Sequence, residues 1–178
     1  MKVKEPENII FIHGLESSGC GFKAQFLKKQ IPRIITPSFK KYIPGLSYKT
    51  LLKKRMIELI EILKSKDLWI IIGSSFGGLM AVLYTCQNPS KVKRLILLAP
   101  FLATSELDPK SFSNLPLDIP VFIYHAKHDK VVSMKKSRAR AEQLFSKINY
   151  QIVENDDHKL HSTVQRINWK ELIYYNRF

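Results

Sequence analysis

The sequence predicts an α/β fold of three layers, in which a mostly parallel sheet carries helices on both faces. Short, unbroken apolar runs alternate with longer segments that have helical periodicity. Most of the runs are continuous and do not alternate with polar residues, which is typical of strands that are buried on both faces. Strands that are separated by helices pair in parallel through crossover connections. We therefore expect a minimal sheet of six strands.

The six expected strands are short and are bounded by breaking residues. Pro37 and Pro100 end two of them, and Pro120 introduces another. The run at residues 9–12 is rich in β-branched and aromatic side chains, which favours a strand that has no exposed face. The predicted strands are residues 9–12, 34–35, 68–72, 95–98, 121–124 and 150–153.

Helices are expected between these strands. Pro32 ends the first, and Ser47 is a candidate N-cap for the second. The apolar positions of the second helix recur at steps of three and four residues, so they share one face; they are Leu52, Met56, Leu59 and Leu63. The predicted helices are residues 22–30, 47–65, 77–87, 134–145 and 162–175.

Size and composition limit the class of protein. A chain of 178 residues with 45% hydrophobic and 25% charged residues favours one globular domain spanning residues 1–178. Two cysteines are too few for a disulfide-dense secreted scaffold. The longest apolar run, residues 68–72, is too short to span a membrane. The N-terminal segment lacks the features of a signal peptide, so we expect a cytoplasmic protein. We expect it to be a monomer or a homodimer.

The formal net charge of +14 has two interpretations. It could attract nucleic acid, anionic lipid or an acidic substrate. It could also reflect lysines and arginines spread over solvated faces. The basic residues are scattered along the chain and form no block long enough for a tail or arm. We favour the second interpretation and expect no specific nucleic-acid partner.

The most specific motif is Gly73-Ser74-Ser75-Phe76-Gly77, which matches G-x-S-x-G with Ser75 in the nucleophile position. It directly follows a predicted strand and opens a predicted helix. A strand–turn–helix corner of this kind exposes the serine hydroxyl at the helix N-terminus, where amide donors favour a developing anion. This context gives the short motif its weight.

A serine hydroxyl is a poor nucleophile without a base, so the chain must supply a histidine and a carboxylate. Asp129 follows the strand at 121–124, and His158 follows the strand at 150–153. The carboxyl ends of parallel strands lie at one edge of a sheet, so these side chains and Ser75 can converge there. His161 is the rival base, and Asp156 and Asp157 are rival acids. We expect His125 and His128 to be packing or surface residues.

On these motifs the chain resembles a small, lidless α/β-hydrolase of the bacterial esterase or thioesterase kind. The resemblance covers nearly the whole chain and is carried by four segments: His13-Gly14, the Ser75 turn, Asp129 to Val132, and Asp157-His158. The chain departs from the family pattern because its first predicted strand is the one before the His-Gly loop. It also lacks a folded cap, and residues 101–119 are the only candidate for a partial cover.

The resemblance implies roles for particular residues. Ser75, Asp129 and His158 match the family's order of nucleophile, acid and base. The backbone N–H groups of Phe76 and Leu15 would form the oxyanion hole, and His13 would fix the loop that carries Leu15. In the 101–119 connection, Phe101 and Leu102 are candidate substrate-binding residues, and its other apolar members could help line an open groove.

The expected function is that of a serine esterase acting on small carboxylic esters with short acyl chains. Two alternatives stay open: a thioesterase acting on acyl-CoA or a related carrier, and a non-catalytic binding protein built on the hydrolase fold. The sequence contains no metal-ligand spacing and no phosphate-binding glycine motif, so we expect neither a metal nor another cofactor.

Overall fold

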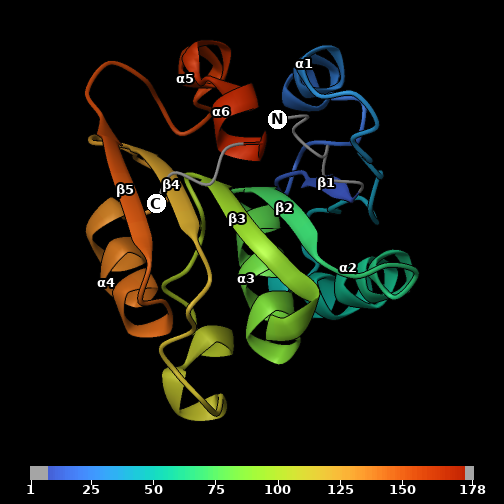
Figure 1. Ribbon diagram of the computed structural model, residues 1–178, viewed down its shortest axis with the longest axis vertical. Helices are drawn as coiled ribbons and strands as arrows, with labels where there is room; N and C mark the ends of the chain where they lie inside the picture. Colours follow the sequence, from blue (N-terminus) through green and yellow to red (C-terminus); the bar gives the residue numbers. More distant parts are fainter. Residues whose placement is uncertain (1–7, 175–178) are drawn as a thin grey trace.

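The computed structural model describes residues 8–174. These residues form one sheet of five parallel strands, which follow one another in space in the same order as in the sequence (Figure 1). The strands are β1 (Ile9–Ile12), β2 (Trp69–Ser74), β3 (Val92–Leu98), β4 (Val121–Ala126) and β5 (Ile148–Val153). Because every pairing is parallel, all carboxyl ends of the strands lie at the same edge of the sheet.

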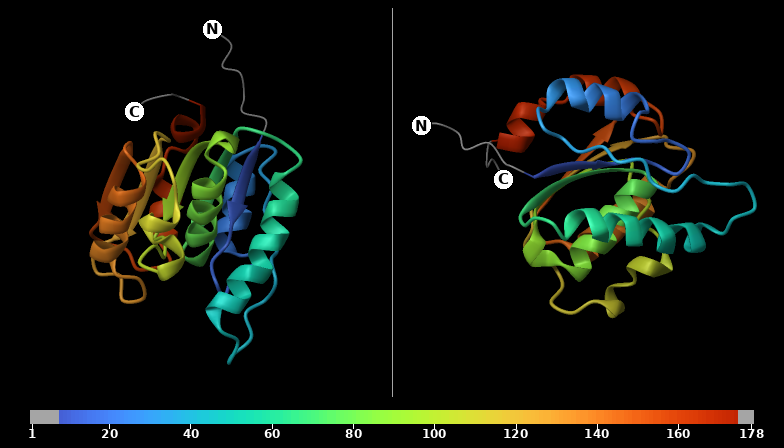
Figure 2. Two further views of the ribbon diagram at one scale, coloured as in Figure 1. Left: turned by 90° about the horizontal axis from the view of Figure 1, so that it is seen from below. Right: turned by 90° about the vertical axis from the view of Figure 1, so that its right-hand side faces the viewer.

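Helices cover both faces of the sheet, so the predicted three-layer α/β architecture is confirmed (Figure 2). One face carries α1 (Phe22–Gln30), α5 (His161–Arg166) and α6 (Trp169–Tyr174). The other carries α2 (Tyr48–Leu63), α3 (Phe76–Gln87) and α4 (Met134–Leu144). A hydrophobic core lies on each face of the sheet, and the central strands contribute side chains to both, because successive side chains point to opposite faces. Ile71 packs with the α2–α4 layer, whereas Ile70 and Ile72 pack with the α1, α5 and α6 layer.

The expected number of strands needs a correction, since residues 8–174 contain five and not six. Ile34 and Ile35 form no regular strand. Instead, Ile35 makes a single parallel bridge to Ile10 on the outer side of β1, with the Phe11 N–H donating to its carbonyl at 2.8 Å. Prolines at 32 and 37 bracket this segment and limit the backbone donors that could extend the pairing.

Two helices also differ from their expected form. The predicted helix at 162–175 is divided into α5 and α6, because Ile167 adopts an extended backbone between them; residue 175 lies outside the described residues. The second helix begins after Ser47 as expected, and the Ser47 hydroxyl accepts a hydrogen bond from the Lys49 N–H. Its four predicted apolar positions are buried in the core, which confirms its inward face.

The connection between β3 and β4 packs onto the body of the protein. It contains two short 3₁₀ turns, η2 (Ser105–Leu107) and η3 (Pro109–Ser111), on the same side of the sheet as α2 and α3 (Figure 2). Glu106 binds the Tyr48 hydroxyl and the Lys49 ammonium group at the start of α2. From α4, Arg140 donates to the carbonyl oxygens of Thr104 and Leu107. These contacts tie the connection to two helices.

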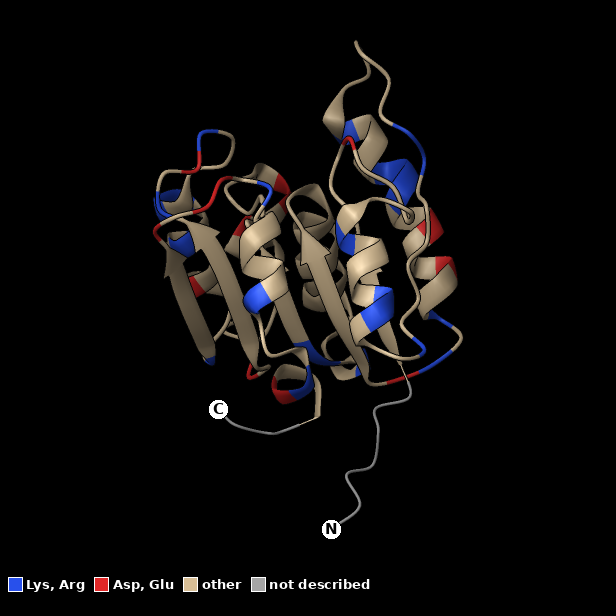
Figure 3. Ribbon diagram, turned by 90° about the horizontal axis from the view of Figure 1, so that it is seen from above, with Lys and Arg blue, Asp and Glu red and all other residues tan. Residues whose placement is uncertain are grey.

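Basic residues are spread over several helices and loops, as Figure 3 shows. They occur on α1, α2 and α4 and in the loops between elements, in agreement with their scatter along the sequence. Within residues 8–174, no helix combines the length and the apolar character needed to cross a membrane.

Candidate active site

Ser75 occupies the sharp turn between β2 and α3. Its backbone has φ 53° and ψ −113°, a positive φ that non-glycine residues rarely adopt. The turn is held in place because the Ser75 N–H donates to the Leu98 carbonyl at 2.9 Å, while the Ser75 carbonyl accepts from Phe101 at 3.1 Å. A strained serine between a parallel strand and a helix is the local geometry that the G-x-S-x-G motif predicts.

The two glycines of the motif are required by close packing. A Cβ on Gly77 would lie 2.1 Å from the Ile12 carbonyl oxygen at the end of β1, and one on Gly73 would lie 2.7 Å from the Gly77 oxygen. Both distances are well inside van der Waals contact with backbone atoms. Glycine at these positions therefore lets the start of α3 lie directly against β1 and β2.

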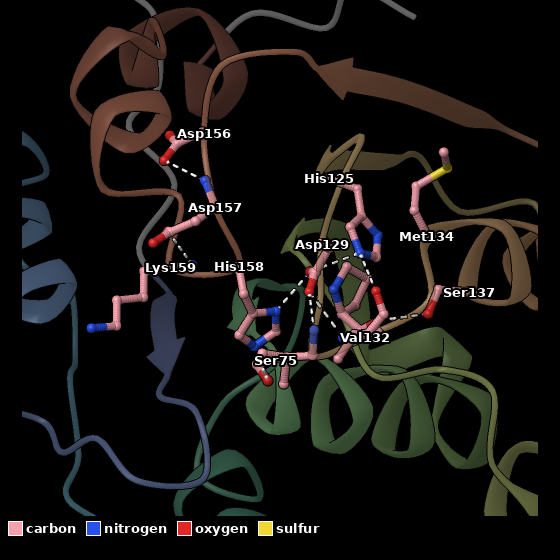
Figure 4. A network of polar contacts seen from close by, with 12 residues as sticks. Ser75, His125, Asp129, Val132, Met134, Ser137, Asp156, Asp157, His158 and Lys159 are labelled. Carbon is pink, nitrogen blue, oxygen red and sulfur yellow. Dashed lines mark hydrogen bonds and ion pairs between the residues drawn. The ribbon is translucent and has the colours of Figure 1, made fainter.

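Ser75, His158 and Asp129 form a continuous chain of hydrogen bonds (Figure 4). The Ser75 hydroxyl lies 2.9 Å from Nε2 of His158, and Nδ1 of the same ring lies 2.7 Å from Oδ2 of Asp129. A carboxylate only accepts, so Nδ1 carries the proton and Nε2 is free to accept from the serine. Three residues that are far apart in the sequence thus meet in the arrangement that can activate a hydroxyl nucleophile.

The Asp129 carboxylate is fully enclosed, and all of its nearby donors favour the charged form. Its Oδ1 accepts from the N–H groups of Val131 and Val132 at 2.8 and 2.9 Å. Burial alone would raise the pKa, but the hydrogen bonds from Val132, His158 and Val131 outweigh it, so the pKa of Asp129 lies below its usual value. The carboxylate therefore remains ionised beside His158 at neutral pH.

A second histidine contacts the same carboxylate. His125, at the end of β4, is fully buried, and its Nε2 lies 3.1 Å from Oδ2 of Asp129 and 3.3 Å from the Val132 carbonyl. Both partners are acceptors, so Nε2 is protonated, and Nδ1 accepts from the Tyr150 hydroxyl at 2.8 Å. The expectation of a packing or surface position for His125 did not include this contact with Asp129. Its spacing four residues before Asp129 is the signal that could have found it.

The two rival acids lie elsewhere in the loop that carries His158, and the rival base lies at the start of α5. Asp156 accepts from the N–H and hydroxyl of Thr163, and Asp157 accepts from the Lys159 N–H. Figure 4 shows both carboxylates pointing away from Asp129. His161 begins α5, and its ring packs on that of Phe22 with the centroids 4.2 Å apart. The structure brings His158, not His161, to Ser75.

The loop that carries His158 is fastened to α1 by Lys23. The ammonium group donates to the Lys159 carbonyl at 2.5 Å. Burial lowers the pKa of Lys23 to about 8, although Asp157 and Asp156 partly oppose the shift. This contact could not be predicted from the sequence, because a single lysine on a helix that lies over one hundred residues earlier carries no local signal.

The predicted oxyanion donors lie on two segments next to Ser75. Phe76 is the first residue of α3, and Leu15 follows Gly14, where an added Cβ would be only 3.6 Å from Cβ of Ser75. Within the described part of the chain, neither the Leu15 N–H nor the Phe76 N–H has a hydrogen-bond acceptor. Both groups are therefore available to a negatively charged oxygen.

His13 fixes the loop that carries Leu15, in line with the expectation for this residue. It is buried, its Nε2 accepts from the Phe39 N–H at 3.0 Å, and its Nδ1 donates to the Gly14 carbonyl at 2.8 Å. Burial lowers the pKa of His13, so the ring is neutral and can serve as donor and acceptor at once.

The two candidate substrate-binding residues have different environments. Phe101 is half-buried beside Ser75, and its ring packs edge-on against Tyr48 with the centroids 5.9 Å apart. Leu102 has no exposed surface and belongs to the core between the sheet and α2–α4. Complete burial removes Leu102 from the expected lining of a groove, whereas Phe101 stays a candidate. Among residues 8–174, no group of three metal-ligating side chains is arranged to hold a metal ion.

Comparison with known proteins gives a consistent result for the fold. Residues 47–117 match the family model described as the α/β-hydrolase fold. This range includes Ser75 but neither Asp129 nor His158. A search of curated proteins gave no significant match.

Solved structures resemble almost the whole chain at low sequence identity. Mouse α/β hydrolase domain-containing protein 10 has a TM-score of 0.72 and 20% identity, covering 93% of this chain and 87% of its own. An α/β serine hydrolase homologue from Coxiella burnetii has a TM-score of 0.66 and 18% identity, covering 99% and 88%. Est1E from Butyrivibrio proteoclasticus, with ferulic acid bound, has a TM-score of 0.65 and 15% identity, covering 90% and 88%. The chain described here therefore has the α/β-hydrolase fold.

Proposed function

We propose that this chain is a serine hydrolase that cleaves carboxylic esters with short acyl chains. The hydrogen-bonded chain from Ser75 through His158 to Asp129 carries the proposal, with contacts of 2.9 and 2.7 Å. The positive φ of Ser75 supports it further, because a strained backbone is kept where a function depends on it.

In the proposed reaction, Ser75 Oγ attacks the carbonyl carbon of the ester while its proton moves to Nε2 of His158. Asp129 holds the Nδ1 proton and stabilises the imidazolium that forms. The carbonyl oxygen becomes an oxyanion that the N–H groups of Leu15 and Phe76 bind, and removal of one such donor typically costs about 10²–10³ in rate. When the tetrahedral intermediate collapses, the bond to the leaving oxygen breaks and His158 passes its proton to the alcohol.

The second half of the reaction repeats these roles with water. His158 takes a proton from a water molecule, whose oxygen attacks the acyl-Ser75 carbonyl. Collapse of the second tetrahedral intermediate returns the proton to Ser75 and releases the carboxylic acid. The same base therefore serves both halves, as the single histidine in contact with Ser75 requires.

The structural neighbours support a carboxylic substrate. Est1E holds ferulic acid, which is a carboxylic acid of the kind that ester hydrolysis releases, and the protein from Coxiella burnetii is described as a serine hydrolase homologue. We extend this chemistry to the present chain as part of the proposal. A small water-soluble ester is the proposed partner, because the connection beside Ser75 is tied to α2 and α4 and places Phe101 next to the nucleophile.

Parallel assays test the proposal directly. Hydrolysis of p-nitrophenyl acetate and butyrate is measured beside release of thiol from acetyl-CoA and butyryl-CoA, before and after treatment with a fluorophosphonate. We expect ester turnover that exceeds thioester turnover and is lost on treatment. Faster thioester turnover would identify a thioesterase. A protein that turns over neither substrate and takes up no fluorophosphonate would be a non-catalytic binding protein.

A further inference from the structure

Arg55 is a buried cation beside the candidate oxyanion hole. It lies on the inward face of α2 and has no exposed surface. Its guanidinium group donates to three backbone carbonyls: Nε to Lys40 at 2.8 Å, one terminal nitrogen to Gly14 at 3.2 Å, and the other to Leu15 at 2.8 Å. One side chain thus holds both peptide groups that flank Leu15.

The burial of this charge calls for an explanation. Removal of a guanidinium group from water is costly unless polar partners replace the hydration, and an apolar side chain of similar volume is often equally stable. In the described part of the chain, Arg55 forms no ion pair, and carbonyl dipoles are its polar partners. A charge kept in this position is therefore a candidate for a role other than stability.

Peptide geometry connects Arg55 to the Leu15 N–H. The Gly14 carbonyl and the Leu15 N–H belong to one planar peptide group, and in a trans peptide they point in opposite directions. Arg55 and the Nδ1 of His13 both donate to the Gly14 oxygen, at 3.2 and 2.8 Å. These bonds fix the plane of the peptide group, so they direct the Leu15 N–H away from Arg55 and prevent the peptide from rotating.

The same guanidinium group contacts the residue that carries the other candidate donor. Its central carbon lies 5.5 Å from the centroid of the Phe76 ring, which is within the range of a cation–π interaction. Arg55 therefore touches the loop of Leu15 on one side and the first residue of α3 on the other. The two segments that must hold their N–H groups at a fixed separation therefore both contact Arg55.

We propose that Arg55 is a positioning residue for the oxyanion hole, which sets the direction of the Leu15 N–H and the spacing between the Leu15 and Phe76 segments. The inference rests on the proposed function, since it assigns a residue to the same site. Arg55 does not touch the substrate in this account. It acts through the peptide group between Gly14 and Leu15, so its replacement should weaken binding of the transition state more than binding of the ester.

The test compares Arg55→Met, which keeps a similar volume but removes all donors, with Arg55→Lys. Lysine keeps the charge but has all its donors on one nitrogen, so it lacks the planar fork whose three nitrogens bond the three carbonyls. Lys54→Met is the matched control, because Lys54 is exposed on the same helix. Three quantities are measured for each protein: kcat and KM for p-nitrophenyl butyrate, the inhibition constant of an alkyl boronic acid, and the thermal midpoint. A boronic acid bound to the serine forms a tetrahedral adduct with an oxygen in the oxyanion hole.

We expect both Arg55 variants to lose about 10² in kcat, the loss typical of one oxyanion donor, with KM changed by less than about threefold. Boronate inhibition should weaken in parallel with kcat/KM, and Lys54→Met should match the wild type. If Arg55→Met does not fold, Arg55→Lys and its boronate affinity decide the question. A folded Arg55 variant with wild-type kcat and boronate affinity, or a loss confined to KM or to the thermal midpoint, overturns the inference.

Failure of the proposed function would look different. A wild-type protein that hydrolyses no ester and does not bind the boronate would refute the proposed function, and the role of Arg55 would be refuted with it. An active wild type with unaffected Arg55 variants would refute only the role of Arg55.

Discussion

His125 donates a hydrogen bond to Asp129, and the Oδ2 atom that accepts it at 3.1 Å also binds His158 at 2.7 Å. The carboxylate therefore lies between two imidazole rings, one facing Ser75 and one facing the core. Two donors on one oxygen favour the ionised acid. They also restrict the carboxylate to the orientation in which it can hold the Nδ1 proton of His158.

The buried histidine makes folding stability depend on pH. Burial lowers the pKa of His125 below its ordinary value of 6.5, although Asp129 and the Val132 carbonyl partly oppose the shift. Below pH 6.5 the unfolded chain binds a proton that folded His125 does not, so the free energy of unfolding falls as the pH decreases from 6.5 to the folded pKa. The loss is about 1.4 kcal/mol for each unit by which the two pKa values differ. Urea denaturation at neutral and mildly acidic pH measures it.

Variants separate the contribution of His125 from that of His13, whose pKa burial also lowers. His125→Gln should reduce the pH-dependent loss but not abolish it, because it removes one of three such groups: burial also lowers the pKa of His161. Stability that stays constant, or that rises, as the pH is lowered from neutral would contradict the neutral state assigned to these histidines.

The assignment of the base is tested by replacing each of the two candidate histidines, His158 and His161. His158→Ala should lower kcat by several orders of magnitude, since the serine would lose its proton acceptor. His161→Ala should cost less than about tenfold, because its ring packs on Phe22 and not on Ser75. Steady-state kinetics with p-nitrophenyl butyrate give both values. Equal losses in the two variants would be incompatible with a single base at His158.

Substrate size is expected to depend on Phe101. The connection that carries it is tied to α2 through Glu106 and to α4 through Arg140, so it is not free to open as a lid. The rate constant kcat/KM should therefore peak at short acyl chains, with no increase when the ester exceeds its solubility. Phe101→Ala should move the optimum to longer chains, since each enclosed methylene contributes about 0.8 kcal/mol. A wild-type optimum at palmitate would contradict this view of the entrance.

Much of the fold and of the candidate site could be predicted from the sequence because the signals are local. The unbroken apolar runs identify the buried strands, and the spacing of Leu52, Met56 and Leu59 identifies the inward face of α2. The turn at Ser75 is specified within five residues, since glycines are needed on both sides for close backbone packing. Asp129 and His158 could be placed because each follows a strand whose carboxyl end lies at the shared edge of the sheet.

The features that the sequence did not reveal depend on contacts between distant segments. The pairing of Ile35 with β1 is limited to one bridge by the nearby prolines. The two adjacent isoleucines in the sequence do not distinguish such a bridge from a regular strand. In the sequence, Arg55 is not distinguishable from the other basic residues of a lysine-rich helix. Only the structure shows its hydrogen bonds to the Gly14 and Leu15 carbonyls. The sequence predicts that Leu102 lines a groove, but its side chain is completely buried in the core between the sheet and the helices.

The identity of the nucleophile is the central claim, and mass spectrometry of the protein treated with a fluorophosphonate tests it most directly. We expect one adduct per chain, located on Ser75, and no adduct in Ser75→Ala. The neighbouring Ser74→Ala variant should label and turn over ester like the wild type, because Ser74 is buried within β2 and outside the hydrogen-bonded chain. An adduct on Ser74 or on another residue, or full ester turnover by a folded Ser75→Ala protein, would contradict the account.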